Sequence, residues 1–173
     1  NGIHFKLKFF FQFISALVLV YFGIHIKFIQ PNYVSIVLSI IWVVGIINAF
    51  NIIDIIDGLS SSIAVIASLA FLIIALPTEQ FYVNFAAAAL AGGCLGFIPF
   101  NMSKKYKVFM GDTGSLFIGF VLASLSLGTS YTDINEIGIF APLLILGIPI
   151  FDTLLVIFYR VLQNRSPFKG SRD

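Results

Sequence analysis

Charge and cysteine are both scarce in this chain. Only 10% of its 173 residues are Asp, Glu, Lys or Arg, whereas a soluble domain carries roughly 25%. Cys94 is the single cysteine, which excludes an internal disulfide and a cysteine-rich metal site. The low charge, a hydrophobic content of 59% and a mean hydropathy of +1.03 together indicate an integral membrane protein.

Several common catalytic and binding motifs are also missing. The sequence contains no P-loop, no Rossmann fingerprint and no Ser-His-Asp pattern. The two histidines, His4 and His25, are expected on opposite sides of the membrane, so they cannot share a metal. These absences exclude the usual nucleotide-binding and serine-hydrolase designs, and we expect no nucleic-acid partner.

Long apolar runs make up most of the chain. We predict an all-α, polytopic membrane protein that forms a single domain over residues 1–173, with about six transmembrane helices of about 20 residues each. The last run is expected to be broken near Gly147 and Pro149, because proline removes a backbone donor and clashes with the preceding turn. The six predicted spans cover residues 9–29, 33–47, 60–76, 81–100, 115–129 and 137–162.

The placement of lysine and arginine gives the predicted orientation. If six spans alternate in direction, all but one of the lysines and arginines fall on one side, and the opposite loops hold only Lys27. The side with the basic residues is expected to be the cytoplasmic face of the plasma membrane. Both polar motifs described next fall on this side. The three lysines between the fourth and fifth spans could also attract phosphates, although ordinary topological charges are an equally good interpretation. The residues on the basic side are Lys6, Lys8, Lys104, Lys105, Lys107, Arg160, Arg165, Lys169 and Arg172.

The first polar motif repeats an amide or a carboxylate at every third position. Its members are Asn48, Asn51, Asp54 and Asp57. Each step of three falls back by about 60° around an α-helix, so Asn51, Asp54 and Asp57 are predicted to share one broad flank. Such hard oxygens suit Mg²⁺, which takes few protein ligands and completes its shell with water and phosphate. The alternative is a capped helix end, but a cap requires one such residue rather than four.

The second polar motif places Asp112 between Gly111 and Gly114, which allow a ligand to approach the backbone closely. A carboxylate beside hydrocarbon costs several kcal/mol unless a cation or donor compensates it, so Asp112 is predicted to bind or catalyse. Ser115 could instead cap the fifth span as a purely structural helix start. Phe109 could stack on a planar base, although composition alone favours an ordinary aromatic at the membrane interface.

Composition and spacing leave two classes of function open. One is an enzyme that handles a phosphorylated substrate with Mg²⁺, and the other is a cation-coupled transporter that uses intramembrane carboxylates. Transporter sites lie near the bilayer midplane on broken helices. Asp54, Asp57 and Asp112 are expected at helix ends on one side, which favours the enzyme.

The two motifs, together with the end of the chain, resemble a known family. In order along the whole chain they are similar to the polyprenyl-phosphate N-acetylhexosamine-1-phosphate transferases, glycosyltransferase family 4. The final Arg-Ser-Pro-Phe stretch looks more like the N-acetylglucosamine branch. The matching segments are Asn48-Ala49-Phe50-Asn51 with Asp54 and Asp57-Gly58-Leu59, Phe109-Met110-Gly111-Asp112-Thr113-Gly114-Ser115-Leu116, and Pro149 with Asp152, Thr153, Arg160 and Arg165-Ser166-Pro167-Phe168.

This resemblance implies a reaction and its partners. N-acetylhexosamine 1-phosphate, most simply GlcNAc 1-phosphate, would pass from a UDP-sugar to undecaprenyl phosphate with release of UMP, in the synthesis of a cell-envelope polysaccharide. The cofactor would be Mg²⁺. The protein would be embedded in the lipid bilayer, and a homodimer is one oligomeric state that the resemblance implies. The sequence does not identify the sugar or the polymer.

The resemblance also assigns roles to residues. Asp112 matches the metal-binding aspartate, and Asn51 matches a metal ligand or a closely supporting amide. Phe109 matches an aromatic that stacks on uracil, which revises the interfacial interpretation above, and Lys6 stands where the family has a basic residue near the prenyl phosphate. The implied catalytic acids are Asp54, Asp57 and Asp112. The implied substrate-binding residues are Asn51, Asp57, Phe109 and Lys6.

The chain departs from the family pattern at three places. The family's paired aspartates precede a stretch like residues 2–8, its His-x-His-His motif follows a stretch like residues 166–173, and neither motif is present. Ile55 replaces the glycine that usually follows the first acid of the aspartate motif. We therefore expect a partial transferase domain that lacks the N-terminal spans and the C-terminal His-rich loop, and that is inactive by itself.

Overall fold

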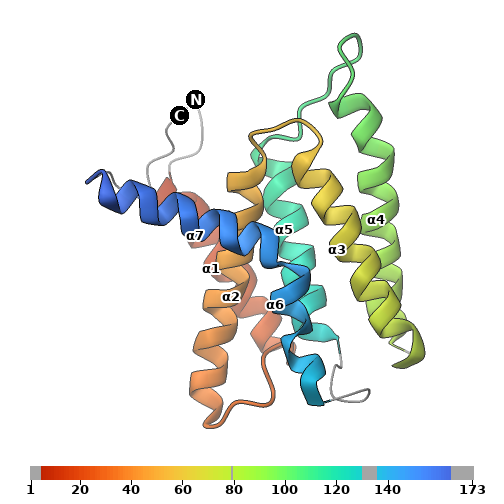
Figure 1. The fold of residues 1–173 in the computed structure, drawn as a ribbon. Helices are drawn as coiled ribbons and strands as arrows, with labels where there is room; N and C mark the ends of the chain where they lie inside the picture. The colour runs from red at the N-terminus through yellow and green to blue at the C-terminus, as the bar shows by residue number, and fades with distance from the viewer. Residues whose placement is uncertain (1–4, 79, 130–135, 165–173) are drawn as a thin grey trace.

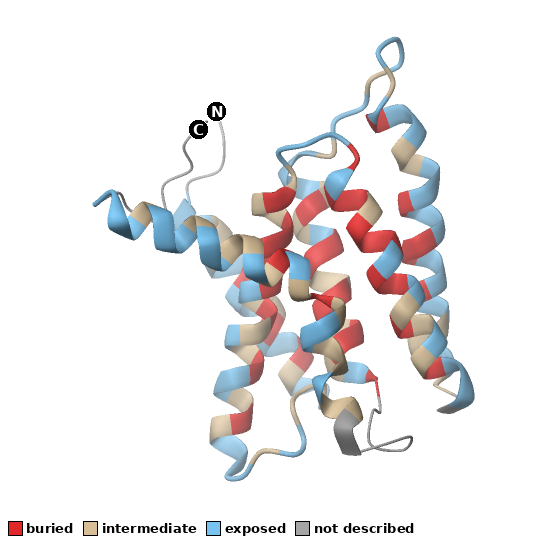
Figure 2. Ribbon diagram, viewed as in Figure 1, coloured by how far each residue is buried: buried red, intermediate tan, exposed pale blue. Residues whose placement is uncertain are grey.

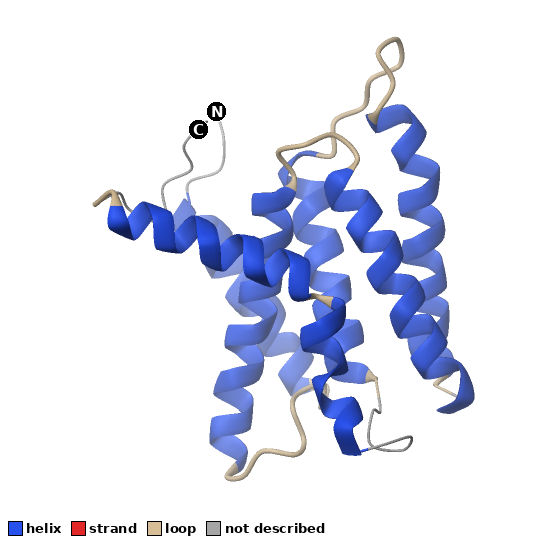
Figure 3. Cartoon of the chain, viewed as in Figure 1, coloured by secondary structure: helices blue, strands red, loops and turns tan. Residues whose placement is uncertain are grey.

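The computed structural model of the chain describes residues 5–78, 80–129 and 136–164 (Figure 1). Within these residues every regular element is a helix and no strand occurs (Figure 3). The predicted all-α class is therefore confirmed. The elements are α1 (Phe5–Tyr21), α2 (Asn32–Ile53), α3 (Leu59–Ala75), α4 (Phe81–Asn101), α5 (Gly111–Gly128), α6 (Ala141–Ile145) and α7 (Gly147–Leu162), with 3₁₀ turns at Leu76–Thr78 and Glu136–Phe140.

Three helices of the described chain, α2, α4 and α5, are long and apolar enough to cross a membrane. Gly138–Ile145 and α7 satisfy the same criterion together as a bent pair. The chain is thus a multi-pass membrane protein with three spanning helices, or four if the bent pair is one span, among the residues described. Fewer helices reach spanning length than the six expected, since α1 and α3 have 17 residues each and about 20 are needed.

The chain bends by 59° between Gly138–Ile145 and α7. This is the place that Gly147 and Pro149 predicted, so the broken last span is confirmed. Leu146 sits at the bend with its side chain fully buried, and its carbonyl accepts a hydrogen bond from the Ile150 N–H at 3.1 Å. The bend carries α7 across α2 rather than along it (Figure 1).

Helix α2 lies at the centre of the bundle, where α1, α5 and α7 all pack against it (Figure 1). Helix α3 packs mainly on α4. The contact between α2 and α5 is tight, because a Cβ added to Gly119 would lie 2.7 Å from the Cα of Ile47. Glycine at such a contact lets two membrane helices approach closely. The approach fixes the position of α5 relative to α2.

Buried residues lie toward the inside of the bundle and exposed residues toward its outside (Figure 2), and many of the exposed residues are large and apolar. Phe71 and Leu122 are fully buried, whereas Phe85 and Phe117 are 75% and 60% exposed. A water-facing surface rarely carries many large apolar side chains together. The outer surface is therefore suited to contact with lipid.

Helix α1 ends earlier than predicted, because Gly23 adopts a left-handed conformation with φ +78°. The Gly23 N–H donates to the carbonyl of Val20, and the Ile24 N–H donates to the carbonyl of Leu19, both at 2.9 Å. These two bonds form a Schellman motif, which satisfies the last carbonyls of a helix. The apolar residues after Gly23 belong to a loop, and hydropathy alone does not distinguish an apolar loop from a helix.

Helices α2 and α5 are longer than predicted, and each extension makes part of a polar motif helical. Helix α2 continues beyond residue 47, so that Asn48 and Asn51 lie within it. Helix α5 begins at Gly111 instead of residue 115, and Asp112 lies in its first turn. An acid in the first turn is favourable because the helix N-terminus carries a partial positive charge.

Candidate functional site

The residues of both polar motifs gather at one end of the bundle, which we call the loop end. It comprises the loop 54–58 between α2 and α3, the loop 102–110 between α4 and α5, and the first turns of α1 and α5 (Figure 1). The loop between α1 and α2, which carries Lys27, lies at the opposite end (Figure 1). Polar contacts join the segments of the loop end across long stretches of sequence.

Asn51 connects α2 to α5. Its Nδ2 donates one hydrogen bond to Oδ1 of Asp112 at 3.0 Å and another to Oγ of Ser115 at 2.9 Å. Ser115 is fully buried and its hydroxyl donates to the Gly111 carbonyl at 3.2 Å. Because both amide hydrogens of Asn51 are engaged, the side chain is fixed and orients the Asp112 carboxylate.

The second carboxylate oxygen of Asp112 is paired with the ammonium group of Lys8 in α1. The two side chains are 52% and 24% exposed, so the pair is accessible from water. From the sequence, Lys6 was expected at the site and Lys8 was expected only among the topological charges. The structure brings Lys8 to Asp112, while the role of Lys6 in substrate binding stays a prediction.

Lys107 joins the two loops of the loop end. Its ammonium group pairs with Oδ2 of Asp57 and lies 5.4 Å from the ring centroid of Phe109, within the range of a cation–π contact. Phe109 is 76% exposed, so its ring is not held in the core. Asp57 and Phe109, the two residues expected at the base, therefore lie around one lysine that the sequence analysis left among the loop charges.

Asn101, the last residue of α4, fixes the two loops to each other. Its Oδ1 accepts a hydrogen bond from the Gly58 N–H at 2.5 Å, and its Nδ2 donates to the Val108 carbonyl at 2.9 Å. Asn101 is 4% exposed, so these bonds satisfy polar groups that water does not reach. The motifs do not include Asn101, and its only signal in the sequence is an amide at the boundary between an apolar run and a basic loop.

Asp54 follows the last residue of α2 and differs from the other two acids. No ion pair or hydrogen bond of its side chain occurs among the described residues. Burial, together with the smaller effect of the negative charges of Asp112 and Asp57, raises its pKa from 3.8 to about 6. Asp112 and Asp57 each have a lysine to balance their charge, whereas Asp54 has none in the described part of the chain. A bound cation would stabilise the ionised form of Asp54.

The spacing of three residues does not place the first motif on one flank, so that prediction is wrong. Helix α2 ends before Asp54, and Asp57 lies in the turn that leads to Gly58, which has φ +78°. Helical periodicity ends where the helix ends. Asn51 therefore faces α5 while Asp57 reaches the loop 102–110.

Asn48 faces α1 rather than the loop end. Its Nδ2 donates to Oε1 of Gln12 at 2.8 Å and to the Val44 carbonyl at 2.7 Å, while Nε2 of Gln12 donates back to Oδ1 of Asn48 at 3.3 Å. Gln12 is buried. The first member of the motif is thus part of a polar bridge between α1 and α2 and does not belong to the site.

Asp112 and Asn51 were the residues expected to hold Mg²⁺. No group of three His, Cys, Asp or Glu side chains that could hold a metal by itself occurs in the described part of the chain. Asn51 directs its amide hydrogens, not its oxygen, at Asp112, which fits a supporting role. Mg²⁺ commonly takes one or two carboxylates and completes its octahedron with water and phosphate. Asp112 and Asp54 fit such an ion when a phosphate ligand shares it.

Comparisons with known proteins agree with the motifs. A profile described as glycosyl transferase family 4 matches residues 1–130. The chain is 34% identical over 174 residues to a probable undecaprenyl-phosphate N-acetylglucosaminyl 1-phosphate transferase of Bacillus subtilis (strain 168), covering 95% of this chain and 48% of that protein. It is 37% identical over 109 residues to a phospho-N-acetylmuramoyl-pentapeptide-transferase of Desulforudis audaxviator (strain MP104C), covering 61% and 30%.

A third relative is the undecaprenyl-phosphate alpha-N-acetylglucosaminyl 1-phosphate transferase of Salmonella typhi. It is 34% identical over 88 residues, which cover 49% of this chain and 24% of that protein. The chain spans about half the length of the Bacillus relative and a smaller share of the other two.

Proposed function

Because the chain belongs to glycosyl transferase family 4, we propose that the intact protein transfers GlcNAc 1-phosphate from a UDP-sugar to undecaprenyl phosphate and releases UMP. The names of the Bacillus and Salmonella relatives carry this sugar and this acceptor. The UDP-sugar donor and the product UMP come from the resemblance of the motifs. Since the chain spans about half of the Bacillus relative, the reaction is proposed for the intact protein.

The observation that carries the proposal is the hydrogen bond between Asn51 and Asp112. It joins the two motifs at one point of the loop end, which also holds Asp54, Asp57 and several lysines; two of these, Lys8 and Lys107, pair with the acids. Lysines bind phosphate oxygens through charge-assisted hydrogen bonds, and carboxylates bind a hard dication. A site that holds both kinds of group suits a diphosphate together with Mg²⁺.

The proposed reaction exchanges one phosphorus–oxygen bond for another. An oxygen of the acceptor phosphate attacks the phosphorus that carries the sugar, and the bond from that phosphorus to the UMP oxygen breaks. The products are a lipid-linked sugar diphosphate and UMP. The acceptor phosphate is already anionic at neutral pH, so the site mainly has to position the reactants and stabilise charge.

The chain's own residues supply that positioning. Asp112, oriented by Asn51, and the neighbouring Asp54 would hold Mg²⁺, which would offset the charge of the diphosphate as the bond to UMP breaks. Phe109 would stack on the base, since every base has an apolar face. Asp57 would accept a hydrogen bond from an N–H of the base, because an ionised carboxylate only accepts.

The acceptor's apolar chain also has a matching space. A cavity of about 1000 Å³ lies between α2, α5 and the bent α6–α7 pair, and it extends from Ala49 toward the loop end to His25 at the opposite end. Most of its lining is apolar, as a polyprenyl chain requires. Lys6, in the first turn of α1, is proposed to lie near the acceptor phosphate.

We place the loop end on the cytoplasmic side of the plasma membrane. Lys8 and Lys107 lie at this end with the acids, whereas Lys27 lies in the loop at the opposite end. An excess of lysine and arginine marks the cytoplasmic side of membrane proteins. A donor nucleotide would then bind from the cytoplasm.

The direct test is formation of the lipid product. Membranes that contain the intact protein, supplied with UDP-N-acetylglucosamine, undecaprenyl phosphate and Mg²⁺, should form lipid-linked sugar diphosphate and UMP in equal amounts. Chelation of Mg²⁺ should stop both. Cation-coupled transport predicts ion-driven solute uptake into proteoliposomes without a lipid product, and that result would overturn the proposal. Asp54, Asp57 and Asp112 lie at helix ends or in the adjoining loop instead of near the middle of the helices, which disfavours transport at this site.

A further inference from the structure

We propose that Lys107 controls binding at the nucleotide site: its ammonium group covers Phe109 and neutralises Asp57, and it moves to the phosphate of the nucleotide when the base binds. Lys107 would then set the preference of the site for nucleotides over nucleosides. This inference rests on the proposed function, and it assigns a role to a residue that lies outside both motifs.

The ammonium group of Lys107 contacts both residues that are proposed to bind the base. Lys107 pairs with Asp57 and lies 5.4 Å from the centroid of the Phe109 ring. A base stacked on that face of the ring would occupy the place of the ammonium group. A base N–H that donates to the Asp57 carboxylate would compete with the same cation. Lys107 therefore occupies both groups that a base needs.

The side chain of Lys107 can move while the backbone around it stays fixed. Asn101 ties the Val108 backbone to the Gly58 backbone through two hydrogen bonds, so the loops on either side of Lys107 are held together. The lysine side chain has a flexible four-carbon stem that carries a compact charge, and that of Lys107 is 26% exposed. The ammonium group can thus relocate while the backbone stays in place.

The phosphate of a nucleotide can replace Asp57 as the partner of the Lys107 ammonium group. When a base displaces the ammonium group from Asp57, the cation is left without its partner beside an arriving phosphate. A charge-assisted hydrogen bond to that phosphate replaces the lost ion pair. A nucleoside has no phosphate and offers no replacement. Each contact of Lys107 that the nucleoside must break lowers its affinity by a factor of up to about five at an exposed position.

The test compares the binding of uridine and UDP to the intact protein in nanodiscs by isothermal titration calorimetry. Lys107→Met removes the charged group and keeps an unbranched apolar stem of similar length. We expect it to bind uridine about threefold more tightly than the wild type and UDP about fivefold more weakly. Lys107→Arg keeps the charge and should retain the wild-type preference for UDP.

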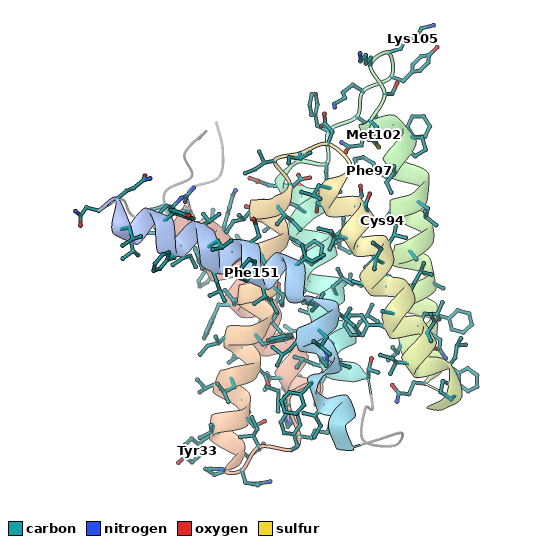
Figure 4. All side chains as sticks on the ribbon, in the orientation of Figure 1. Tyr33, Cys94, Phe97, Met102, Lys105 and Phe151 are labelled. Atoms are coloured by element: carbon teal, nitrogen blue, oxygen red, sulfur yellow. The ribbon has the colours of Figure 1, made fainter. Side chains whose placement is uncertain are left out.

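Lys105 provides a matched control in the same loop. Its ammonium group lies 5.1 Å from the Tyr106 ring centroid, it has no ion pair within the described residues, and it stands at the tip of the loop (Figure 4). Lys105→Met should leave both affinities within about twofold of the wild type, since its cation covers no proposed ligand group.

Three results would overturn the inference. One is a Lys107→Met protein with the same ratio of uridine to UDP affinity as Lys105→Met. Another is weaker binding of uridine by Lys107→Met, which would mean that the lysine supports the base site instead of covering it. A wild-type protein that binds neither ligand contradicts the proposed function and this inference together, whereas binding with an unchanged ratio contradicts only the inference.

Discussion

Asn51 donates a hydrogen bond to Asp112 at 3.0 Å, although 61 positions separate the two residues in sequence. The contact requires that α2 and α5 pack closely, which Gly119 allows against the backbone of Ile47. It also requires that α2 continue as a helix through Asn51 and that α5 begin before Asp112. The geometry of the site therefore depends on the packing of two membrane helices.

Removal of the Asn51 amide should reduce activity more than stability. Asn51→Ala leaves Asp112 without its orienting donor, and the loss of a supporting partner of this kind commonly costs about 10- to 100-fold in activity. Steady-state turnover of the purified intact protein measures the effect. Ser124→Ala in α5 is the control, because among the described residues this hydroxyl bonds only to the Phe120 carbonyl of its own helix. Turnover of Asn51→Ala within about twofold of the wild type would contradict the orienting role.

The close approach of α2 and α5 can be tested with a single methyl group. Gly119→Ala would place its Cβ against backbone atoms of Ile47 and Ile46 that cannot rotate away. We expect a loss of about 1–3 kcal/mol in stability, together with a loss of turnover because Asn51 and Asp112 move apart. Gly92→Ala in α4 is the matched control, since its Cβ would meet nothing within 4 Å. Equal thermal midpoints for the two variants would contradict the tight contact.

The amide bridge between α1 and α2 should show strong coupling. Gln12→Leu leaves the Asn48 amide with only its bond to the Val44 carbonyl among the described residues. Asn48→Leu removes the partner of the buried Gln12 amide. We expect each single substitution to cost about 1–2 kcal/mol. The double substitution removes both polar groups and should recover most of that loss. Thermal unfolding of the four proteins gives the double-mutant cycle. A double variant that is destabilised by the full sum of the single effects would show that the two amides do not interact.

The raised pKa of Asp54 predicts that the stability of the folded protein depends on pH. Its pKa is raised from 3.8 to about 6 in the folded protein, so the folded state holds the proton more tightly than an unfolded chain does. The ionised form therefore opposes folding, and stability is lost as the pH rises through this interval. In the absence of Mg²⁺, Asp54→Asn should melt at a higher temperature than the wild type at about pH 8 and at the same temperature near pH 4. A difference that does not change with pH would contradict the raised pKa.

Hydropathy located most of the helices because lipid-facing and buried residues of a membrane bundle are both apolar. It could not locate the helix ends. The end of α1 depends on the left-handed conformation of Gly23, and the apolar residues after it look like more helix. The polar residues at the end of α2 and the start of α5 look like loop, although they are helical up to Ile53 and from Gly111 onward.

The motifs predicted which acids gather at the loop end, because charge placement sets the side of the membrane and both motifs fall on the same side. They did not predict the partners of those acids. Lys8 and Lys107 look like ordinary topological charges in the sequence, and the rotation of α1 and the path of a loop decide whether they meet a carboxylate. Asn101 acts through backbone groups of two loops, which no pattern of side chains records.

The most direct measurement of the account is the turnover of Asp112→Asn in the intact protein across a titration of Mg²⁺. The substitution keeps the shape of the side chain and removes the charge that a hard dication needs. We predict that turnover falls by at least about 100-fold, equivalent to about 2.7 kcal/mol in the barrier, while the thermal midpoint shows that the protein is folded. Near-normal turnover of Asp112→Asn at low Mg²⁺ would contradict the account and would move the metal to Asp54 and Asp57.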